Sequence, residues 1–228
     1  RPHFMIWPRR LPRAVIAPET SLWFNLEVTA RRFPNRTAYL FFGRALTYRQ
    51  LHDEAVALAG WLQRAGVQAG DRVAVYLQNC PQFPIALYAV LRADAVVVPV
   101  NPMNKADEVQ HYISDPETKV VICSADLAAT VEAANAALPE HARVRAIVAT
   151  RYSDTMPAGT IAEADAPPPA MEQWLRSDPP LPAGCTRWLD AIGERLAPTP
   201  ARAGPDDLAL LPYTSGTTGL PKGCMHTH

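Results

Sequence analysis

Apolar residues recur along the first 150 positions at spacings that alternate between those of a helix and those of a strand. The clearest helix begins at Thr47, where Gln50 completes a capping box and Leu46 and Leu51 form a hydrophobic staple. Apolar residues then follow at intervals of three and four until Gly66, which we expect to end the helix. The pattern therefore predicts one long amphipathic helix with a defined start and stop.

Strand and helix patterns continue in alternation on both sides of this helix. We expect a helix capped by Thr20 or Ser21, strands at 37–42, 72–77, 95–100, 118–123 and 144–149, helices capped by Asn79 and Asn104, and a helix around 127–138. Such alternation is typical of β-α-β units. It predicts an α/β fold with a mostly parallel sheet and helices on both faces.

Residues 151–206 interrupt the alternation. Seven prolines fall between positions 157 and 182, so we interpret this stretch as a long surface excursion with one short helix around 188–196. A linker between two domains is the alternative, and it is weaker because the residues after Asp206 are too few for a second core. The apolar run 208–212 is expected to rejoin the main sheet.

Composition narrows the class of protein. The 228 residues are 48% hydrophobic and 19% charged, which allows a sizeable core and argues against disorder. The 22 basic and 22 acidic residues balance, so the basic footprint of a nucleic-acid binder is missing. No apolar run approaches the roughly 20 residues of a membrane-spanning helix. The nine arginines within residues 1–49 predict a solvated arm or, alternatively, contact with anionic lipid or a partner.

The four cysteines point to a reducing compartment. They are widely spaced and include no C-x-x-C pair, which argues against a disulfide scaffold and against a zinc finger. Cys224, His226 and His228 would share one face of a strand, but three ligands on one strand rarely close around zinc, so we predict no metal site here. We expect a cytoplasmic protein, with peripheral membrane contact through the basic arm as an option.

The segment from Tyr213 to Gly223 carries the candidate chemistry, directly after an apolar strand. Gly216 and Gly219 allow backbone N–H groups to turn inward around an anion, and the hydroxyls of the segment add donors. Lys222 supplies a compact positive charge in a chain with only three lysines. The candidate phosphate-binding residues are Thr214, Ser215, Gly216, Thr217, Thr218, Gly219 and Lys222.

Other interpretations of this segment fit less well. The spacing around Lys222 does not match a Walker A loop, which requires G-x-x-x-x-G-K-[ST]. A serine hydrolase using Ser215 is disfavoured because Tyr213 stands where the nucleophile elbow needs glycine. The alternative without a binding function is that the segment is a glycine- and threonine-rich surface turn that holds no ligand.

The string S-G-T-T-G-L-P-K-G resembles the phosphate-binding signature of the adenylate-forming superfamily, which includes acyl-CoA synthetases, luciferases and peptide-synthetase adenylation domains. Two further segments are similar to the family's first and second core motifs, L-T-Y-R-Q-L at 46–51 and L-R-A-D-A-V-V-V-P-V-N-P at 91–102. Asp94 replaces a usual glycine there, and aspartate tolerates the left-handed backbone better than most residues. Within the superfamily, G-T-T-G at 216–219 and V-N-P at 100–102 look more like the motifs of fatty-acyl or aryl-CoA ligases than those of peptide-synthetase domains.

The resemblance implies a two-step ligase that uses ATP, Mg²⁺ and coenzyme A. A carboxylic acid attacks the α-phosphate of ATP to give an acyl-adenylate and pyrophosphate, and the thiol of coenzyme A then displaces AMP. The 214–222 loop would hold the β- and γ-phosphates. His228 matches a histidine that lies near the acyl group in acyl-CoA ligases. The family's adenine, ribose and magnesium contacts and its catalytic lysine lie downstream of this loop, so no catalytic residue is assigned in this chain.

The resemblance therefore predicts that residues 1–228 are a partial N-terminal AMP-binding domain. We expect such a piece to be inactive by itself and to self-associate through surface that the rest of the domain would cover. A protein that keeps the fold as a non-enzymatic nucleotide-binding or interaction module is the alternative. The presence of the downstream motifs in a longer parent would distinguish the two.

Overall fold

The computed structural model describes residues 5–14, 17–157, 159–214 and 220–228. In this part of the chain a seven-stranded sheet has the order β11-β8-β4-β3-β5-β6-β7, and only β11 runs antiparallel to its neighbour. Its strands are β3 (Arg72–Tyr76), β4 (Val96–Pro99), β5 (Val120–Ser124), β6 (Ala146–Thr150), β7 (Thr186–Arg187), β8 (Leu208–Leu210) and β11 (His226–Thr227). The predicted mostly parallel sheet is confirmed, and the 208–212 run does rejoin it.

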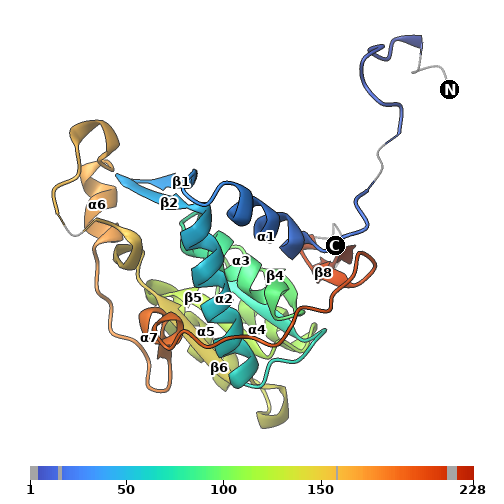
Figure 1. The fold of residues 1–228 in the computed structure, drawn as a ribbon. Coiled ribbons are helices and arrows are strands. Elements are labelled where there is room, and N and C mark those ends of the chain that lie inside the picture. The colour runs from blue at the N-terminus through green and yellow to red at the C-terminus, as the bar shows by residue number, and fades with distance from the viewer. Residues whose placement is uncertain (1–4, 15–16, 158, 215–219) are drawn as a thin grey trace.

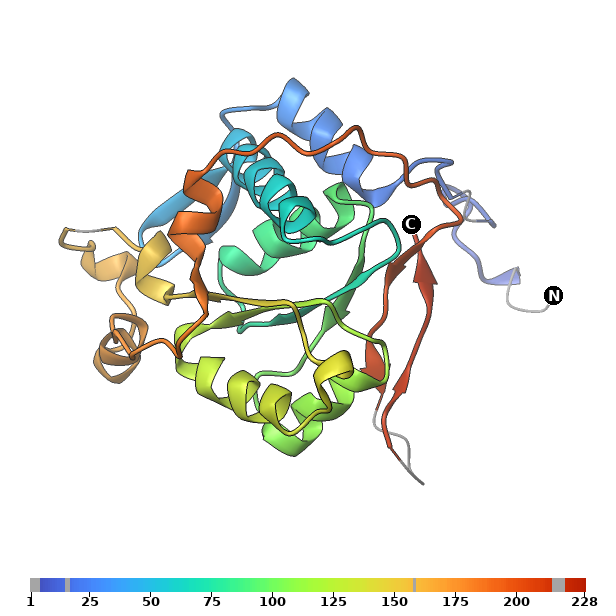
Figure 2. The same cartoon turned by 90° about the horizontal axis from the view of Figure 1, so that it is seen from below.

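Helices cover both faces of the sheet, as Figures 1 and 2 show from two directions. On one side lie α1 (Leu22–Arg32), α2 (Tyr48–Arg64), α3 (Gln82–Arg92) and α7 (Trp188–Gly193). On the other side lie α4 (Ala106–Ser114) and α5 (Ala128–Ala136). The α/β class predicted from the alternation is therefore confirmed.

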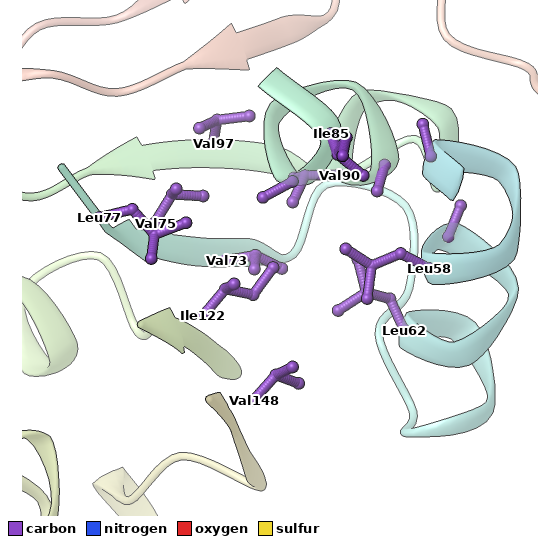
Figure 3. Close-up of a cluster of buried hydrophobic side chains, with 14 of the residues drawn as sticks. Leu58, Leu62, Val73, Val75, Leu77, Ile85, Val90, Val97, Ile122 and Val148 are labelled. Atoms are coloured by element: carbon purple, nitrogen blue, oxygen red, sulfur yellow. The ribbon is translucent and has the colours of Figure 1, made fainter. Parts of the chain in front are cut away.

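The central strands β3 to β6 are mostly apolar because they bury side chains on both faces. In β3, Val73 and Val75 point to the α2–α3 side, whereas Ala74 and Tyr76 point to the α4–α5 side. Figure 3 shows the first of these cores, in which side chains of α2 and α3 meet those of the four central strands. Its labelled members are Leu58, Leu62, Val73, Val75, Leu77, Ile85, Val90, Val97, Ile122 and Val148.

The capping box predicted at the start of α2 is present. The Gln50 backbone N–H donates to the Thr47 hydroxyl at 3.3 Å, and the Thr47 N–H donates to the Gln50 side chain at 2.9 Å. Leu46 and Leu51, the predicted staple, are both buried. Gly66 follows the end of the helix with φ +91°, a conformation that favours glycine.

Two predicted caps are wrong by one or two residues. Before α3 the cap is Pro81 rather than Asn79, because the Pro81 carbonyl accepts the first intrahelical hydrogen bond, from the Ile85 N–H at 3.4 Å. Before α4 the cap is Lys105 rather than Asn104, because the Glu108 carboxylate accepts the Lys105 N–H at 2.8 Å.

The proline-rich stretch 151–206 is largely exposed, as a surface excursion would be, but a few of its described side chains are buried in the core. It contains α6 (Pro169–Leu175), which the sequence analysis missed, besides β7 and α7. Leu175 and Trp188 are buried in the α2–α3 core, so the stretch supplies core residues. The prolines obscured α6, although Pro169 stands at the first helical position, where its missing N–H costs nothing.

A small hairpin stands next to this stretch, formed by β1 (Thr37–Phe41) and β2 (Arg44–Thr47). Its turn has Gly43 at φ +79°, and a Cβ there would lie 2.9 Å from Ile161. The hairpin and the 151–206 stretch therefore pack closely at this turn, which Figure 1 shows beside α6.

Asp94 takes the left-handed conformation expected where the family uses glycine, with φ +57°. Its carboxylate also accepts the backbone N–H groups of Arg202 and Ala203 at 3.0 and 3.1 Å. Asp94 thus keeps the conformation of the turn, and its carboxylate fixes the irregular segment that leads to β8. Among the described residues, no helix is long and apolar enough to cross a membrane.

Candidate functional site

The candidate phosphate segment begins where β8 leaves the sheet at its carboxyl end. β8 runs parallel to β4, and the Leu211 N–H donates to the Val97 carbonyl at 2.8 Å. The chain then forms a second hairpin from β9 (Tyr213–Thr214) and β10 (Lys222–Gly223), drawn in red beyond the edge of the sheet in Figure 2. Carboxyl ends of parallel strands are the usual place for ligands in open α/β sheets.

Thr214 and Lys222 face each other across this β9–β10 hairpin. Directly opposed residues of an antiparallel pair project from the same face, so the hydroxyl and the ammonium group lie on one side of the stem. Both residues are exposed, and Lys222 forms no ion pair within the described part of the chain. The structure thus brings together two of the predicted phosphate ligands at the stem.

The other five predicted ligands lie outside the described residues. They are Ser215, Gly216, Thr217, Thr218 and Gly219. Their role in phosphate binding remains a prediction from the sequence.

An aromatic cluster fixes the hairpin to α4. The Tyr213 ring makes edge contacts with His111 and Tyr112, with ring centroids 5.6 and 4.8 Å apart. The Tyr213 hydroxyl donates to the Asp115 carboxylate, and His111 Nε2 lies 2.8 Å from the Pro221 carbonyl oxygen. Burial, with the neighbouring charge and hydrogen bond of Asp115, raises the pKa of Tyr213, so this hydroxyl stays protonated and keeps donating.

Gly223 is needed at the base of the hairpin. A Cβ at this position would lie 3.0 Å from Leu211 and 3.3 Å from the ring of Tyr213. The final glycine of the motif therefore lets β10 approach the sheet closely. The Cys224 N–H adds a bond to the Pro212 carbonyl at 2.8 Å. Close packing at Gly223 and the hydrogen bond between Cys224 and Pro212 thus both hold the base of the hairpin that carries Lys222.

Sequence reasoning missed these supporting residues. Tyr213 directly precedes the motif, but its partners His111 and Asp115 are about a hundred positions away and carry no local signal. Only the packing of α4 against the hairpin brings them together.

His228 lies at the start of α1. Its Nδ1 accepts a hydrogen bond from the Leu22 N–H at 3.0 Å, and its own N–H donates to the Asp207 carbonyl at 3.2 Å. The Ser21 side chain makes no capping bond, so His228 provides a partner for a helix N–H that would otherwise lack one. Burial lowers the pKa of the imidazole, which favours the neutral form that can accept. Its predicted place near an acyl group remains untested.

The described residues contain no group of three or more histidine, cysteine, aspartate or glutamate side chains placed to hold a metal ion. Cys224, His226 and His228 thus form no such group. The stem offers a hydroxyl and an ammonium group, which suit phosphate oxygens rather than a cation.

Comparison with protein families gives a match to the model described as AMP-binding enzyme over residues 26–228. A long-chain-fatty-acid–CoA ligase of Bacillus subtilis is 33% identical over the whole chain, which spans 40% of that relative. A feruloyl-CoA synthase of Amycolatopsis is 35% identical over 87% of the chain and 32% of the relative. The chain thus spans well under half the length of these curated relatives.

Solved structures show the same fold. An anthranilate CoA ligase in complex with anthranoyl-AMP superposes with a TM-score of 0.74 at 22% identity, over 93% of this chain and 35% of that one. A fatty acyl CoA synthetase of Mycobacterium tuberculosis superposes with a TM-score of 0.63 at 27% identity, over 91% and 34%. Both alignments cover only part of the longer protein.

Proposed function

The chain belongs to the AMP-binding enzyme family, and from that premise we propose that it is the N-terminal part of an ATP-dependent acid–thiol ligase. In this proposal the ligase joins a carboxylic acid to ATP, releases pyrophosphate, and passes the acyl group from the adenylate to the thiol of coenzyme A. The names of the curated relatives support a fatty or aryl acid as substrate.

The observation that carries the proposal is the pairing of Thr214 with Lys222 on an anchored stem. A hydroxyl donor and an ammonium group on one face suit the oxygens of a polyphosphate. Contacts of Tyr213 and Pro221 with α4 hold this pair in place before any nucleotide arrives. The stem would contribute by positioning the β- and γ-phosphates and stabilising their charge.

Magnesium would neutralise part of the phosphate charge when bound with ATP. The carboxylate of Asp115, which contacts the hairpin, is already engaged by the Tyr213 hydroxyl, so we assign no residue of this chain to the ion. Coenzyme A enters the proposal as the second substrate, with no residue assigned to it either.

We also propose that residues 1–228 are a partial N-terminal AMP-binding domain, and that the adenine, ribose and magnesium contacts lie in chain beyond it. The share of the curated relatives that is covered, 40%, supports this division. Residues 151–206 belong to the domain in this proposal, because α7 packs in its core.

A cytoplasmic location, with the N-terminal arm touching the membrane surface, completes the proposal. Met5 and Ile6 are 90% and 88% exposed, and Arg9 and Arg10 follow them on the exposed arm. Apolar side chains next to arginines suit the interface of an anionic membrane. Sedimentation of the chain with anionic and with neutral vesicles tests this contact.

Pyrophosphate release tests the activity. ATP is supplied with a panel of fatty and aryl acids, to residues 1–228 and to a longer ligase that contains them. We expect acid-dependent release of pyrophosphate from the longer protein and none from residues 1–228, because in this proposal the other nucleotide contacts lie outside residues 1–228. Release by residues 1–228 alone would overturn the division of the domain, and no release by the longer protein with any acid would overturn the ligase.

A further inference from the structure

The helices on the α2–α3 side of the sheet carry a basic pocket where α1 packs on α2 and α3 (Figure 1). Its volume is about 530 Å³, within the roughly 300–1,000 Å³ of small-molecule sites. Three arginines and two carboxylates are the charged groups of its lining, so its balance is positive. The pocket lies on the face of the sheet opposite to α4, and α4 is the helix that holds the β9–β10 hairpin. It is therefore separate from the candidate phosphate stem.

The two carboxylates of the pocket already have partners. Glu27 accepts a hydrogen bond from the Arg31 guanidinium at 2.9 Å, in an ion pair between adjacent turns of α1. Asp53 Oδ1 lies 2.9 Å from His52 Nδ1, and the Asp53 side chain is 64% exposed and therefore solvated. Among the described residues, no ion pair involves the other two arginines of the lining. These two arginines are therefore the cations that the pocket offers to a ligand.

Arg92, the first of them, is half-buried at the end of α3 and marks one end of the pocket. Its guanidinium lies 5.8 Å from the ring centroid of Trp23, in the first turn of α1, and donates to the Thr199 carbonyl at 2.7 Å. Burial lowers the pKa of this group, although the charges of Asp94 and Glu27 act in the opposite direction. The positive charge is thus held in place and incompletely compensated, and an anion would gain a charge-assisted hydrogen bond there.

Arg49, the second, marks the other end of the pocket. Its backbone N–H donates to the Pro34 carbonyl at 3.0 Å, just beyond the C-terminus of α1, and its side chain is exposed. Because α1 has 11 residues, about 15 Å of helix separates this point from the end where Arg92 packs. Both guanidinium groups belong to the lining of one pocket, so they present two separate positive ends to a ligand.

Two separated cations select the shape of the ligand. A single phosphate is too small to touch both ends, whereas a molecule with an anionic group at each end engages both guanidinium groups at once. Arginine suits phosphate because its planar fork of donors matches the phosphate oxygens. Glu27, in the middle of α1, and the exposed Asp53 keep lone pairs that accept hydrogen bonds from hydroxyl groups. The lining therefore favours a hydroxylated bisphosphate.

We propose that this pocket binds a soluble, elongated small molecule with a phosphate group at each end and hydroxyl groups between them, as in a sugar bisphosphate. Arg92 takes one phosphate and Arg49 takes the other. The proposal goes beyond the ligase activity, because none of these residues belongs to the candidate phosphate stem. A membrane lipid whose headgroup joins two phosphates offers the same chemistry, so the experiment separates the two sources.

Fructose 1,6-bisphosphate is the probe, and fructose 6-phosphate, which carries a phosphate at one end alone, is the matched control ligand. Isothermal titration calorimetry of the 228-residue chain measures both, at about 0.15 M salt so that attraction between distant charges is screened. We expect saturable binding of one bisphosphate per chain and at least tenfold weaker binding of the monophosphate. Lys222→Ala should bind the bisphosphate as the natural chain does, because the stem lies elsewhere.

Arg49→Gln and Arg92→Gln each remove one positive end. Each should weaken binding of the bisphosphate roughly ten- to a hundredfold, the range of a charge-assisted contact, and leave the monophosphate almost unaffected, because a single phosphate can use the remaining end. Arg32→Gln is the matched control, since this exposed neighbour on α1 lies over the Phe33 ring and outside the lining. Circular dichroism checks the fold of each variant, and the exposed Arg49 keeps the test valid if Arg92→Gln fails to fold.

Vesicles that contain cardiolipin, whose headgroup joins two phosphates, form the second arm of the experiment. They should not displace the bisphosphate from the chain at equal phosphate concentration. Displacement by the vesicles would assign the pocket to a lipid headgroup and overturn the soluble ligand.

The proposal is also overturned if the bisphosphate shows no saturable binding, or if the monophosphate binds as tightly. The same holds if a folded pocket variant binds the bisphosphate as the natural chain does, or if Arg32→Gln weakens binding as much as the pocket variants. Because the readout involves no ATP and no turnover, failure here is separate from failure of the proposed ligase activity.

Discussion

Lys222 is exposed and close to Thr214, so its charge is available to a ligand. In the longer ligase, Lys222→Ala should weaken the use of ATP by about 1.5–3 kcal/mol, the value of a charge-assisted contact. Kinetics with ATP and acid varied separately should show a rise of roughly ten- to a hundredfold in the requirement for ATP and little change for the acid. Lys105→Ala, on an exposed residue of the α4 cap, is the control. An unchanged dependence on ATP would remove Lys222 from the site.

His228 gives the second residue-scale prediction, a dependence of stability on pH. The imidazole must be neutral to accept the Leu22 N–H, and burial lowers its pKa below the usual value near 6.5. Above about pH 6.5 the side chain is neutral in both folded and unfolded chains, so the bond contributes fully. Below that pH the unfolded chain takes up the proton first, and the free energy of unfolding falls until folded His228 is protonated too.

Urea unfolding at a series of pH values, followed by tryptophan fluorescence, measures this effect. We expect the natural chain to lose stability relative to His228→Gln as the pH falls from about 7.5 to about 5.5. His141→Gln changes an exposed histidine and should leave the pH profile as it was. Parallel profiles for the natural chain and His228→Gln would contradict the role of the imidazole.

At the scale of single elements, the N-caps of α1 and α2 can be compared directly, because these two helices lie on the same side of the sheet. Thr47 caps α2 with its hydroxyl, whereas the Ser21 side chain at the same position of α1 makes no capping bond. Thr47→Ala should therefore reduce the free energy of unfolding by about 1 kcal/mol, and Ser21→Ala should change it by a few tenths. Midpoints of urea unfolding give both values, and equal losses would show that hydroxyl capping is not the cause.

The elements also show how far local sequence determines structure. The start of α2 was predicted to the residue because Thr47, Gln50 and the staple act within five positions. The starts of α3 and α4 were misplaced because Asn79 and Asn104 are good caps in isolation, while the nearby Pro81 and Glu108 decide the local geometry. In the candidate site the motif pointed to Thr214 and Lys222, which the structure places opposite each other, but Asp115 and His111 act through tertiary packing that no local pattern encodes.

At the scale of the whole molecule, apolar side chains remain in contact with solvent. The strand at 208–212 carries little of this surface, because Ala209 is buried and Leu208 and Leu210 are half-buried. Exposed apolar residues occur at several other places, among them Phe33 at the end of α1, which is 46% exposed, and Leu40 on β1, which is 80% exposed. Surface of this kind favours association.

We therefore predict that residues 1–228 self-associate as their concentration rises. Sedimentation velocity should show a shift to larger species, and the double variant Phe33→Glu, Leu40→Glu should reduce that shift. Met103→Glu, which adds one charge at a position that is 78% exposed and lies between β4 and α4, serves as the control. A single monomeric species at every concentration would contradict the prediction.

The late arrival of β8 has a consequence for synthesis on the ribosome. β4 ends at Pro99, but the strand that pairs with its free edge begins only at Leu208. While the intervening chain is being made, β4 presents unpaired backbone groups, which other chains can pair with. Contacts between such distant segments also form slowly, because a long loop must close first. A nascent chain of this protein is therefore most exposed to misassembly, and most dependent on chaperones, in the interval before residue 208 emerges.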